Sequence, residues 1–341
     1  MTRTEVRIGR PFADTRSAGT LGRKRQRPGL WFVLPAAALF LLFFAYPLIA
    51  SLWQSFFSTK GGTSTWVGLA QYARLFSDPL VGESLFNAGL FLFVQVPLMI
   101  GLALGLAYVL NQTFLKFKTG FRLIYFLPAI TTLVAYSVVF RVLLATDGGA
   151  VNQLIGLFGI APVDWLNNEA WARVAVIASI TWRWTGYNMV IILAGLQAIP
   201  AELYEAAKID GAGRWATFSK VVVPQLRPVL IFTSVTSTIG ALQLFDENFI
   251  LTGGGPSNAT LTPVLYLYRV GFQQFDFGYA SAIAWLLVIL TGIISIIQFW
   301  LMRERREKRF KVAAKRGSDS SAHTVRKEAV QKETAQKETV S

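Results

Sequence analysis

Long apolar stretches separated by short polar segments make up most of the chain from residue 30 onward. A helix needs about 20 mostly apolar residues to cross the roughly 30 Å hydrocarbon core of a bilayer. This pattern predicts an all-α polytopic membrane protein with six transmembrane helices, whose domain over 30–302 is flanked by basic tails over 1–29 and 303–341. The predicted spans are approximately 30–52, 86–110, 122–144, 172–195, 228–251 and 279–302.

The composition supports a membrane protein and excludes several kinds of chemistry. Hydrophobic residues make up 53% of the 341 residues and charged residues only 15%, against about 25% charged in a typical soluble domain. Cysteine is absent and the single histidine, His323, lies in the C-terminal tail, which excludes thiolate and most imidazole chemistry. The sequence also contains no phosphate-binding GxxxxGK[ST] loop. We therefore expect no enzymatic activity and no cofactor bound by this chain.

The distribution of Lys and Arg predicts the orientation in the membrane. Segments 1–29, 111–122, 196–227 and 303–341 carry 8, 3, 4 and 12 of the 33 basic residues, whereas the three segments on the opposite side, 53–85, 145–171 and 252–278, together carry only Lys60, Arg74 and Arg269. Because basic residues concentrate in cytoplasmic segments, both termini and the 196–227 loop are expected in the cytoplasm. Topology and attraction to anionic lipid therefore explain the net charge of +14, and no nucleic-acid partner is expected.

The loop over 196–227 has the pattern of two short helices joined by glycine. Pro200 suits a helix start, residues 201–209 favour a helix, and Gly211 suits a helix end. A second helical piece then places three apolar side chains on one face and ends at Pro224: Trp215, Phe218 and Val222. Two interpretations stay open on this pattern alone, an element that docks on a partner and an amphipathic connector on the membrane surface.

Several motifs resemble one transporter family over residues 30–302. Glu205-Ala206-Ala207, followed by Asp210-Gly211-Ala212 and then by Pro224 after an apolar run, is similar to the EAA loop of binding-protein-dependent ABC importer permeases. Phe126-Leu127-Pro128-Ala129 and Thr252-Gly253-Gly254-Gly255-Pro256 match the sugar-permease subgroup, typified by the first membrane subunit of maltose and glycerol-3-phosphate importers. The resemblance implies the architecture of a type I ABC importer permease.

This resemblance also implies partners and a coupling role. In the family, the loop forms a coupling helix that docks on a cytoplasmic ATPase dimer, which binds ATP and Mg. The other expected partners are a second, homologous permease and an extracytoplasmic solute-binding protein, all at a bacterial inner membrane. The residues that the resemblance assigns to ATPase coupling are Glu205, Ala206, Ala207, Asp210, Gly211 and Ala212.

Polar and aromatic residues in the fourth and fifth spans are candidates for contact with the solute. Arg183 is central in its span, and such residues usually face a partner, the bundle interior or a water-filled path. It could pair with Glu247 or with a partner carboxylate, or it could contact solute. Trp184 and Tyr187 nearby offer aromatic faces that suit sugar rings. Helical periodicity places Gly240, Leu244 and Glu247 on one face, with Gln243 beside them.

The family resemblance extends this candidate substrate path to Ala129, Leu133, Ile180, Arg183, Trp184, Tyr187, Gly240, Ala241 and Leu244. Ala129 and Leu133 replace a tyrosine and a serine of the maltose-type site, and Ala241 and Leu244 replace asparagines. These departures argue against maltose itself and leave another saccharide, a polyol or a glycerol phosphodiester. A self-contained secondary transporter is the alternative. It usually shows internal repeats, and none is evident between 30–144 and 172–302.

Overall fold

The structure is a computed structural model that describes residues 28–112 and 114–300. Most of the predicted N-terminal tail and the whole predicted C-terminal tail therefore lie outside the described residues. The chain divides into two compact units at Ala50–Ser51, and each is described by itself. The first contains α1 (Pro28–Phe40) and the π-helical turn η1 (Leu41–Ala45), which continues into α2 (Tyr46–Gln54).

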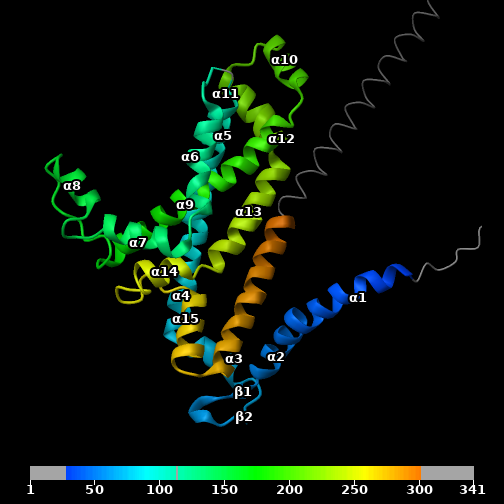
Figure 1. Cartoon of the computed structure of the whole chain (residues 1–341), viewed down its shortest axis with the longest axis vertical. Coiled ribbons are helices and arrows are strands. Elements are labelled where there is room, and N and C mark those ends of the chain that lie inside the picture. Colours follow the sequence, from blue (N-terminus) through cyan, green and yellow to red (C-terminus); the bar gives the residue numbers. More distant parts are fainter. Residues whose placement is uncertain (1–27, 113, 301–341) are drawn as a thin grey trace, which may run out of the picture. The chain divides into compact units, whose positions relative to one another are not determined.

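The second unit, from Ser51 onward, is mostly helical (Figure 1). It begins with a two-stranded antiparallel sheet of β1 (Phe57–Ser58) and β2 (Thr65–Trp66), joined through the 3₁₀ turn η2 (Lys60–Gly62). The elements that follow are α3 (Ala70–Ser77), α4 (Pro79–Leu90), η3 (Phe91–Gln95), α5 (Val96–Asn111), α6 (Lys118–Ile130), α7 (Leu133–Leu143), α8 (Ala150–Gly156), α9 (Glu169–Gln197), α10 (Ala201–Ile209), α11 (Arg214–Thr217), η4 (Phe218–Val222), α12 (Val223–Gln225), α13 (Arg227–Leu242), α14 (Asp246–Leu251), α15 (Pro263–Tyr268) and η5 (Arg269–Gln273).

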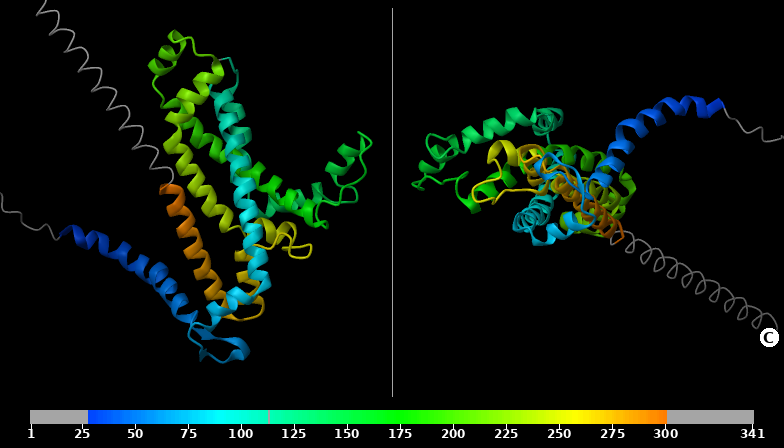
Figure 2. Two further views of the ribbon diagram at one scale, coloured as in Figure 1. Left: turned by 180° about the vertical axis from the view of Figure 1, so that it is seen from behind. Right: turned by 90° about the horizontal axis from the view of Figure 1, so that it is seen from below.

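Within the described residues, three helices are long and apolar enough to cross a membrane alone: Phe32–Gln54, Pro79–Asn111 and Phe277–Trp300. The second of these joins α4, η3 and α5 and runs beside α9, as both views in Figure 2 agree. Buried Ala103 and Ala107 on α5 pack against buried Met189 and Ile192 on α9. The small alanine side chains permit the two helices to approach closely.

The helices α6 and α9 also pack closely at a glycine. A Cβ atom at Gly186 would overlap the backbone carbonyl of Tyr125 on α6. Gly186 is therefore required by the crossing of these two helices, three residues after Arg183 on α9.

The third predicted span, 122–144, is not one straight helix. It consists of α6 and α7, which are bent by 98° at Thr131 and Thr132. Pro128 lies in the last turn of α6, and the Thr131 backbone N–H and hydroxyl both donate to the Pro128 carbonyl. Proline weakens the helix, and this local capping then ends it.

The fifth predicted span, 228–251, is also wrong as a continuous helix. Helix α13 ends at Leu242, and the chain restarts as α14 only at Asp246. Between them, the Leu244 carbonyl accepts a hydrogen bond of 2.6 Å from the Thr262 hydroxyl. A non-helical backbone at this point is tolerated because a residue distant in sequence satisfies the freed carbonyl.

Candidate solute path and coupling loop

The break between α13 and α14 forms part of a cavity of about 230 Å³. The cavity brings together most of the predicted path residues from α7, α9, α13 and α14: Leu133, Ile180, Trp184, Tyr187, Gly240, Ala241, Gln243, Leu244 and Glu247. Ala129 and Arg183 are the two predicted path residues that do not line it. Because the chain leaves the helical path after Leu242, residues that would be spread around a helix line one hollow.

Sequence reasoning missed several lining residues, of which Gln95 is the most informative. Gln95 is the last residue of the π-helical turn η3, and π-helical turns occur frequently at functional sites. A lone glutamine within the apolar span 86–110 was a signal available in the sequence. The other lining residues outside the predicted path are Met99, Asn188, Thr236, Ser237, Phe245 and Asp246.

Two buried amides share one sulfur acceptor at the wall of the cavity. Gln95 Nε2 and Asn188 Nδ2 donate to the sulfur of Met99 at 3.4 and 3.6 Å. Asn188 Nδ2 also donates to the carbonyl of Trp184 at 3.1 Å. These contacts use amide N–H groups, so they leave the amide oxygens of both side chains as acceptors.

Arg183 is buried behind the cavity wall, with 5% of its surface exposed. Its Nη2 donates to the carbonyl of Thr131 at 3.2 Å, and its guanidinium lies 4.6 Å from the Tyr136 ring centroid and 5.3 Å from that of Trp184. The alternative in which Arg183 pairs with Glu247 is not supported, because no ion pair forms between them within the described residues. The Tyr136 side chain is close to both charged groups. Nε and Nη1 of Arg183 and the Tyr136 hydroxyl are buried without a hydrogen-bond partner.

A second cavity, of about 560 Å³, lies against α14, which also lines the first cavity. Phe249, Ile250 and Leu251 of α14 line it, whereas Asp246 and Glu247 at the start of α14 line the first cavity. The remaining lining is largely polar or charged: Arg141, Ala145, Thr146, Asp147, Leu166, Asn167, Thr252 and Gly253. Helix α14 therefore contributes to two hollows in this unit.

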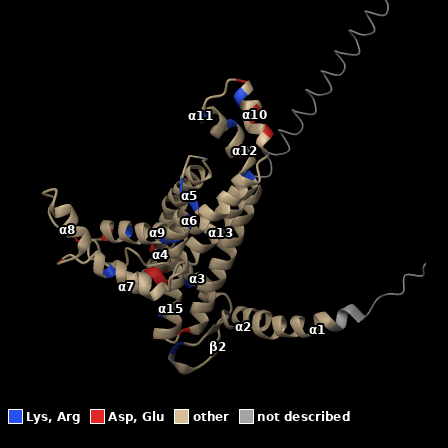
Figure 3. Ribbon diagram, turned by 45° about the horizontal axis from the view of Figure 1, so that its top comes forward, with Lys and Arg blue, Asp and Glu red and all other residues tan. Residues whose placement is uncertain are grey.

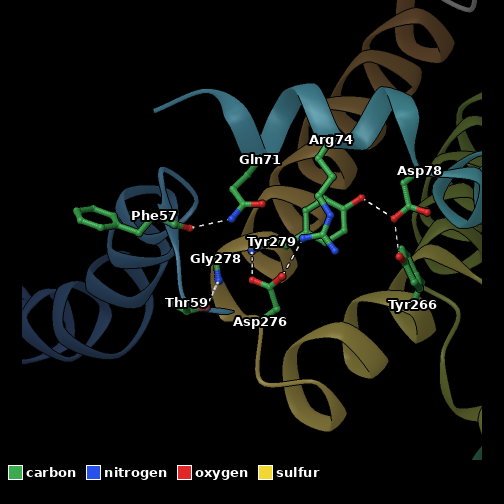
Figure 4. A network of polar contacts seen from close by, with 9 residues as sticks. All are labelled: Phe57, Thr59, Gln71, Arg74, Asp78, Tyr266, Asp276, Gly278 and Tyr279. Atoms are coloured by element: carbon green, nitrogen blue, oxygen red, sulfur yellow. Dashed lines mark hydrogen bonds and ion pairs between the residues drawn. The ribbon is translucent and has the colours of Figure 1, made fainter. Parts of the chain in front are cut away.

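A separate polar network links the sheet and α3 to the start of the last described helix (Figure 4). Arg74 Nη1 forms an ion pair with Asp276 at 2.8 Å, and its guanidinium stacks 3.6 Å from the Tyr279 ring centroid. Asp78 accepts hydrogen bonds from the hydroxyls of Tyr279 and Tyr266. Every charged group of this network has a partner.

The surroundings of Asp78 shift its acidity. Burial raises the pKa of Asp78, but the hydrogen bonds from Tyr266, Tyr279 and the Leu80 amide, together with Arg74, outweigh it. The pKa of this carboxyl is therefore lowered, and the folded structure favours the ionised form.

Close packing accompanies this network. The Gly278 N–H donates to the Thr59 hydroxyl at 3.0 Å, and a Cβ atom at Gly278 would overlap the Phe57 carbonyl. Gly278 therefore permits the sheet and the last described helix to meet.

The predicted coupling loop is helical on both sides of Gly211, but its second piece, formed by α11, η4 and α12, continues past the expected end at Pro224 to Gln225. Pro200 precedes α10, and Gly211 ends it with a positive φ of 71°, which favours glycine. Ala207 is buried, whereas the other predicted coupling residues are exposed or half-buried: Glu205, Ala206, Asp210, Gly211 and Ala212.

The outer surface of this loop combines apolar and charged side chains. Ile209 and Trp215 are 86% and 78% exposed, and charged residues gather around α10, whereas the long faces of α5 and α13 carry few (Figure 3). Trp215 contacts Phe218, and Val222 is buried. The exposed face of this loop therefore presents apolar and charged side chains together.

A comparison with protein families identifies the fold. The family described as the binding-protein-dependent transport system inner membrane component matches residues 98–307. The chain belongs to this family. It is a permease subunit of a binding-protein-dependent importer, and its curated relatives are transport permeases rather than enzymes.

The chain matches curated relatives over most of their length. The lactose transport system permease protein LacF of Rhizobium radiobacter is 43% identical over 297 residues, which are 86% of this chain and 99% of LacF. The arabinooligosaccharides transport system permease protein AraP of Bacillus subtilis (strain 168) is 34% identical, over 82% of this chain and 89% of AraP.

A solved structure shares the fold. A chain of a bacterial ABC transporter that imports the acidic polysaccharide alginate matches with a TM-score of 0.71 and 25% identity, covering 82% of this chain and 96% of that chain. A second structure of the alginate transporter, in complex with an alginate pentasaccharide-bound periplasmic protein, matches with a TM-score of 0.69. The predicted type I ABC importer permease fold is confirmed at this level.

Proposed function

We propose that this permease forms half of the translocation path for a sugar or sugar-like solute and works by alternating access. A second permease subunit would supply the other half, and an extracytoplasmic solute-binding protein would deliver the solute. A separate ATPase dimer would bind ATP and Mg, because this chain contains no phosphate-binding loop.

The cavity beside the α13–α14 break carries this proposal. Nine residues chosen as a path from the sequence line it together. Aromatic rings of Trp184 and Tyr187 can stack on the C–H faces of a sugar, and the amides of Gln95 and Asn188 can accept from hydroxyls. The second cavity on α14 supports a longer route through the same unit.

Six membrane passages fit the described helices. Besides the three long apolar helices, the bent pair α6–α7, helix α9 and the shorter apolar α13 would each form one passage. The charge distribution favours a cytoplasmic location for α10 and both termini. In that orientation the exposed face around Ile209 and Trp215 would dock on the ATPase.

The relatives suggest the class of solute. Their names include lactose and arabinooligosaccharides, and the matched structures come from an alginate importer. A saccharide is therefore favoured over the polyol and the glycerol phosphodiester.

Purification from the native membrane in a mild detergent, followed by mass spectrometry, tests the assembly. We expect recovery of an ATPase with a phosphate-binding loop and of a second permease with an EAA loop. Recovery of this chain alone, still transporting after reconstitution, would favour the alternative of a secondary transporter.

Two substitutions test the coupling loop. Glu205→Lys reverses an exposed charge on α10, and Gly211→Pro cannot adopt the positive φ found there. Both should abolish ATP-driven uptake while leaving membrane insertion unchanged. Glu169→Lys, at an exposed glutamate of α9, is the control and should transport normally. Normal uptake by both loop variants would exclude the coupling role.

A further inference from the structure

We propose that the cavity beside α14 selects uncharged saccharides and rejects acidic ones, through the carboxylates of Asp246 and Glu247. This inference rests on the proposed function, because it assigns a substrate class to the same cavity. Among the described lining residues, these two carboxylates are the charged groups, and neither Lys nor Arg lines the cavity.

The nearest basic residue on α9 is held away from the cavity. Arg183 does not line it, and its guanidinium is engaged by the Thr131 carbonyl and by the faces of Tyr136 and Trp184. Neither Asp246 nor Glu247 forms an ion pair within the part of the chain that the structure describes. An anionic group in the cavity would therefore meet negative charge first.

The remaining polar lining suits hydroxyl groups. Carboxylates accept short, strong hydrogen bonds from hydroxyls, and the oxygens of Gln95, Asn188 and Gln243 are further acceptors. By contrast, two like charges about 6 Å apart at an effective dielectric constant of about 20 disfavour each other roughly a hundredfold. The same side chains therefore favour a neutral sugar and oppose a uronate or sulfonate.

The relatives show that this family is divided on solute charge. LacF is named for lactose, which is neutral, whereas a matched importer takes the acidic polysaccharide alginate. A relative from Agrobacterium fabrum is named for sulfoquinovosyl glycerol, which carries a sulfonate. Solute charge is thus a property that the cavity of each member must determine, and the lining here indicates the neutral class.

The chain has no cysteine, which permits a direct test in the assembled importer. Ser237→Cys places one thiol in the cavity lining, where labelling by a thiol reagent can be followed on this chain. The probes are lactose and arabinotriose, each beside its counterpart with one hydroxymethyl or terminal carbon oxidised to a carboxylate. The concentration of each sugar that halves the labelling rate is measured.

We expect the neutral probes to protect the thiol at concentrations at least about tenfold lower than their acidic counterparts. Glu247→Gln and Asp246→Asn, each combined with Ser237→Cys, should reduce that ratio about tenfold by improving protection by the acids. Glu202→Gln, which neutralises an exposed carboxylate of α10, is the control and should leave the ratio unchanged.

The outcomes separate this inference from the proposed function. Equal protection by neutral and acidic probes, or a ratio unaffected by both cavity substitutions, would overturn charge selection and leave the sugar path intact. If no sugar of either kind protects the thiol, the cavity is not on the path, and the proposed function itself fails.

Discussion

Two polar clusters in this permease differ in how completely their groups are paired. Around Asp78, each charged side chain has a partner, including the ion pair of Arg74 with Asp276 at 2.8 Å. Around Arg183, two guanidinium nitrogens and the Tyr136 hydroxyl are buried without a hydrogen-bond partner, although Arg183 is more deeply buried than Arg74, whose side chain is 38% exposed.

The difference separates a cluster that only stabilises the fold from one that still has unpaired hydrogen-bonding groups. A buried polar group without a hydrogen bond costs about 1–3 kcal/mol, so it persists where another molecule or subunit satisfies it. The paired network joins the sheet to the last described helix, and its charged groups are already occupied by partners within the chain. The unpaired cluster lies behind the cavity wall, where water or a partner subunit would complete it.

The largest loss of stability should come from substituting two glycines at close backbone contacts, Gly278 beside the Asp78 network and Gly186 near Arg183. Gly278→Ala and Gly186→Ala each place a Cβ atom onto a carbonyl oxygen, so each should cost about 3 kcal/mol of stability. The yield of folded complex and its Tm in detergent measure this loss. Gly89→Ala, which has open space on α4, is the matched control and should retain or raise Tm. Wild-type stability of both close-contact variants would contradict these contacts.

Asp78→Asn should break the paired network without altering transport specificity. Replacing the carboxylate leaves two tyrosine hydroxyls with a poorer acceptor, at a cost of about 1–3 kcal/mol and a lower Tm. Because the folded-state pKa of Asp78 is lowered, its contribution exists above the ordinary pKa and disappears as pH falls through the lowered value. The Tm difference between the two proteins should therefore shrink on acidification. A difference that grows instead would exclude the carboxylate as its source.

Tyr187→Ala should affect transport but not assembly. Loss of one aromatic face from the cavity removes about 0.5–1.5 kcal/mol of stacking, which lowers kcat/KM for uptake up to about tenfold. Arg183→Ala should act in the same direction. Val190→Ala, on α9 outside the lining, provides the control. Unchanged kinetics in both the Tyr187 and the Arg183 variant would show that the assignment of the path is wrong.

The smallest effect is expected at Gln95. Gln95→Met keeps a similar volume and removes one polar group from the cavity, worth about 1 kcal/mol or about fivefold in KM. Stability should change little, since the one hydrogen bond of the Gln95 side chain to a described group goes to the weak sulfur acceptor of Met99. A large fall in Tm with unchanged KM would show instead that Gln95 stabilises the fold and does not contact the solute.

Apolar patterning predicted where the helices lie better than where they break. The single-helix interpretation of 228–251 failed because the carbonyl of Leu244 is satisfied by Thr262, a partner that helical periodicity cannot reveal. Likewise, helical periodicity did not reveal that Arg183 lies against the ring of Tyr136 on α7 beyond the bend. By contrast, the helix end at Gly211 could be predicted, because a positive φ depends on the residue itself.

The most direct test of the distinction between the two clusters is ATP-driven sugar uptake by the reconstituted importer, measured with Tm for Asp78→Asn and Tyr187→Ala side by side. We predict a lower Tm with unchanged KM for Asp78→Asn, and an unchanged Tm with raised KM for Tyr187→Ala. The reverse result, in which Asp78→Asn alters KM and Tyr187→Ala only destabilises the complex, would contradict it.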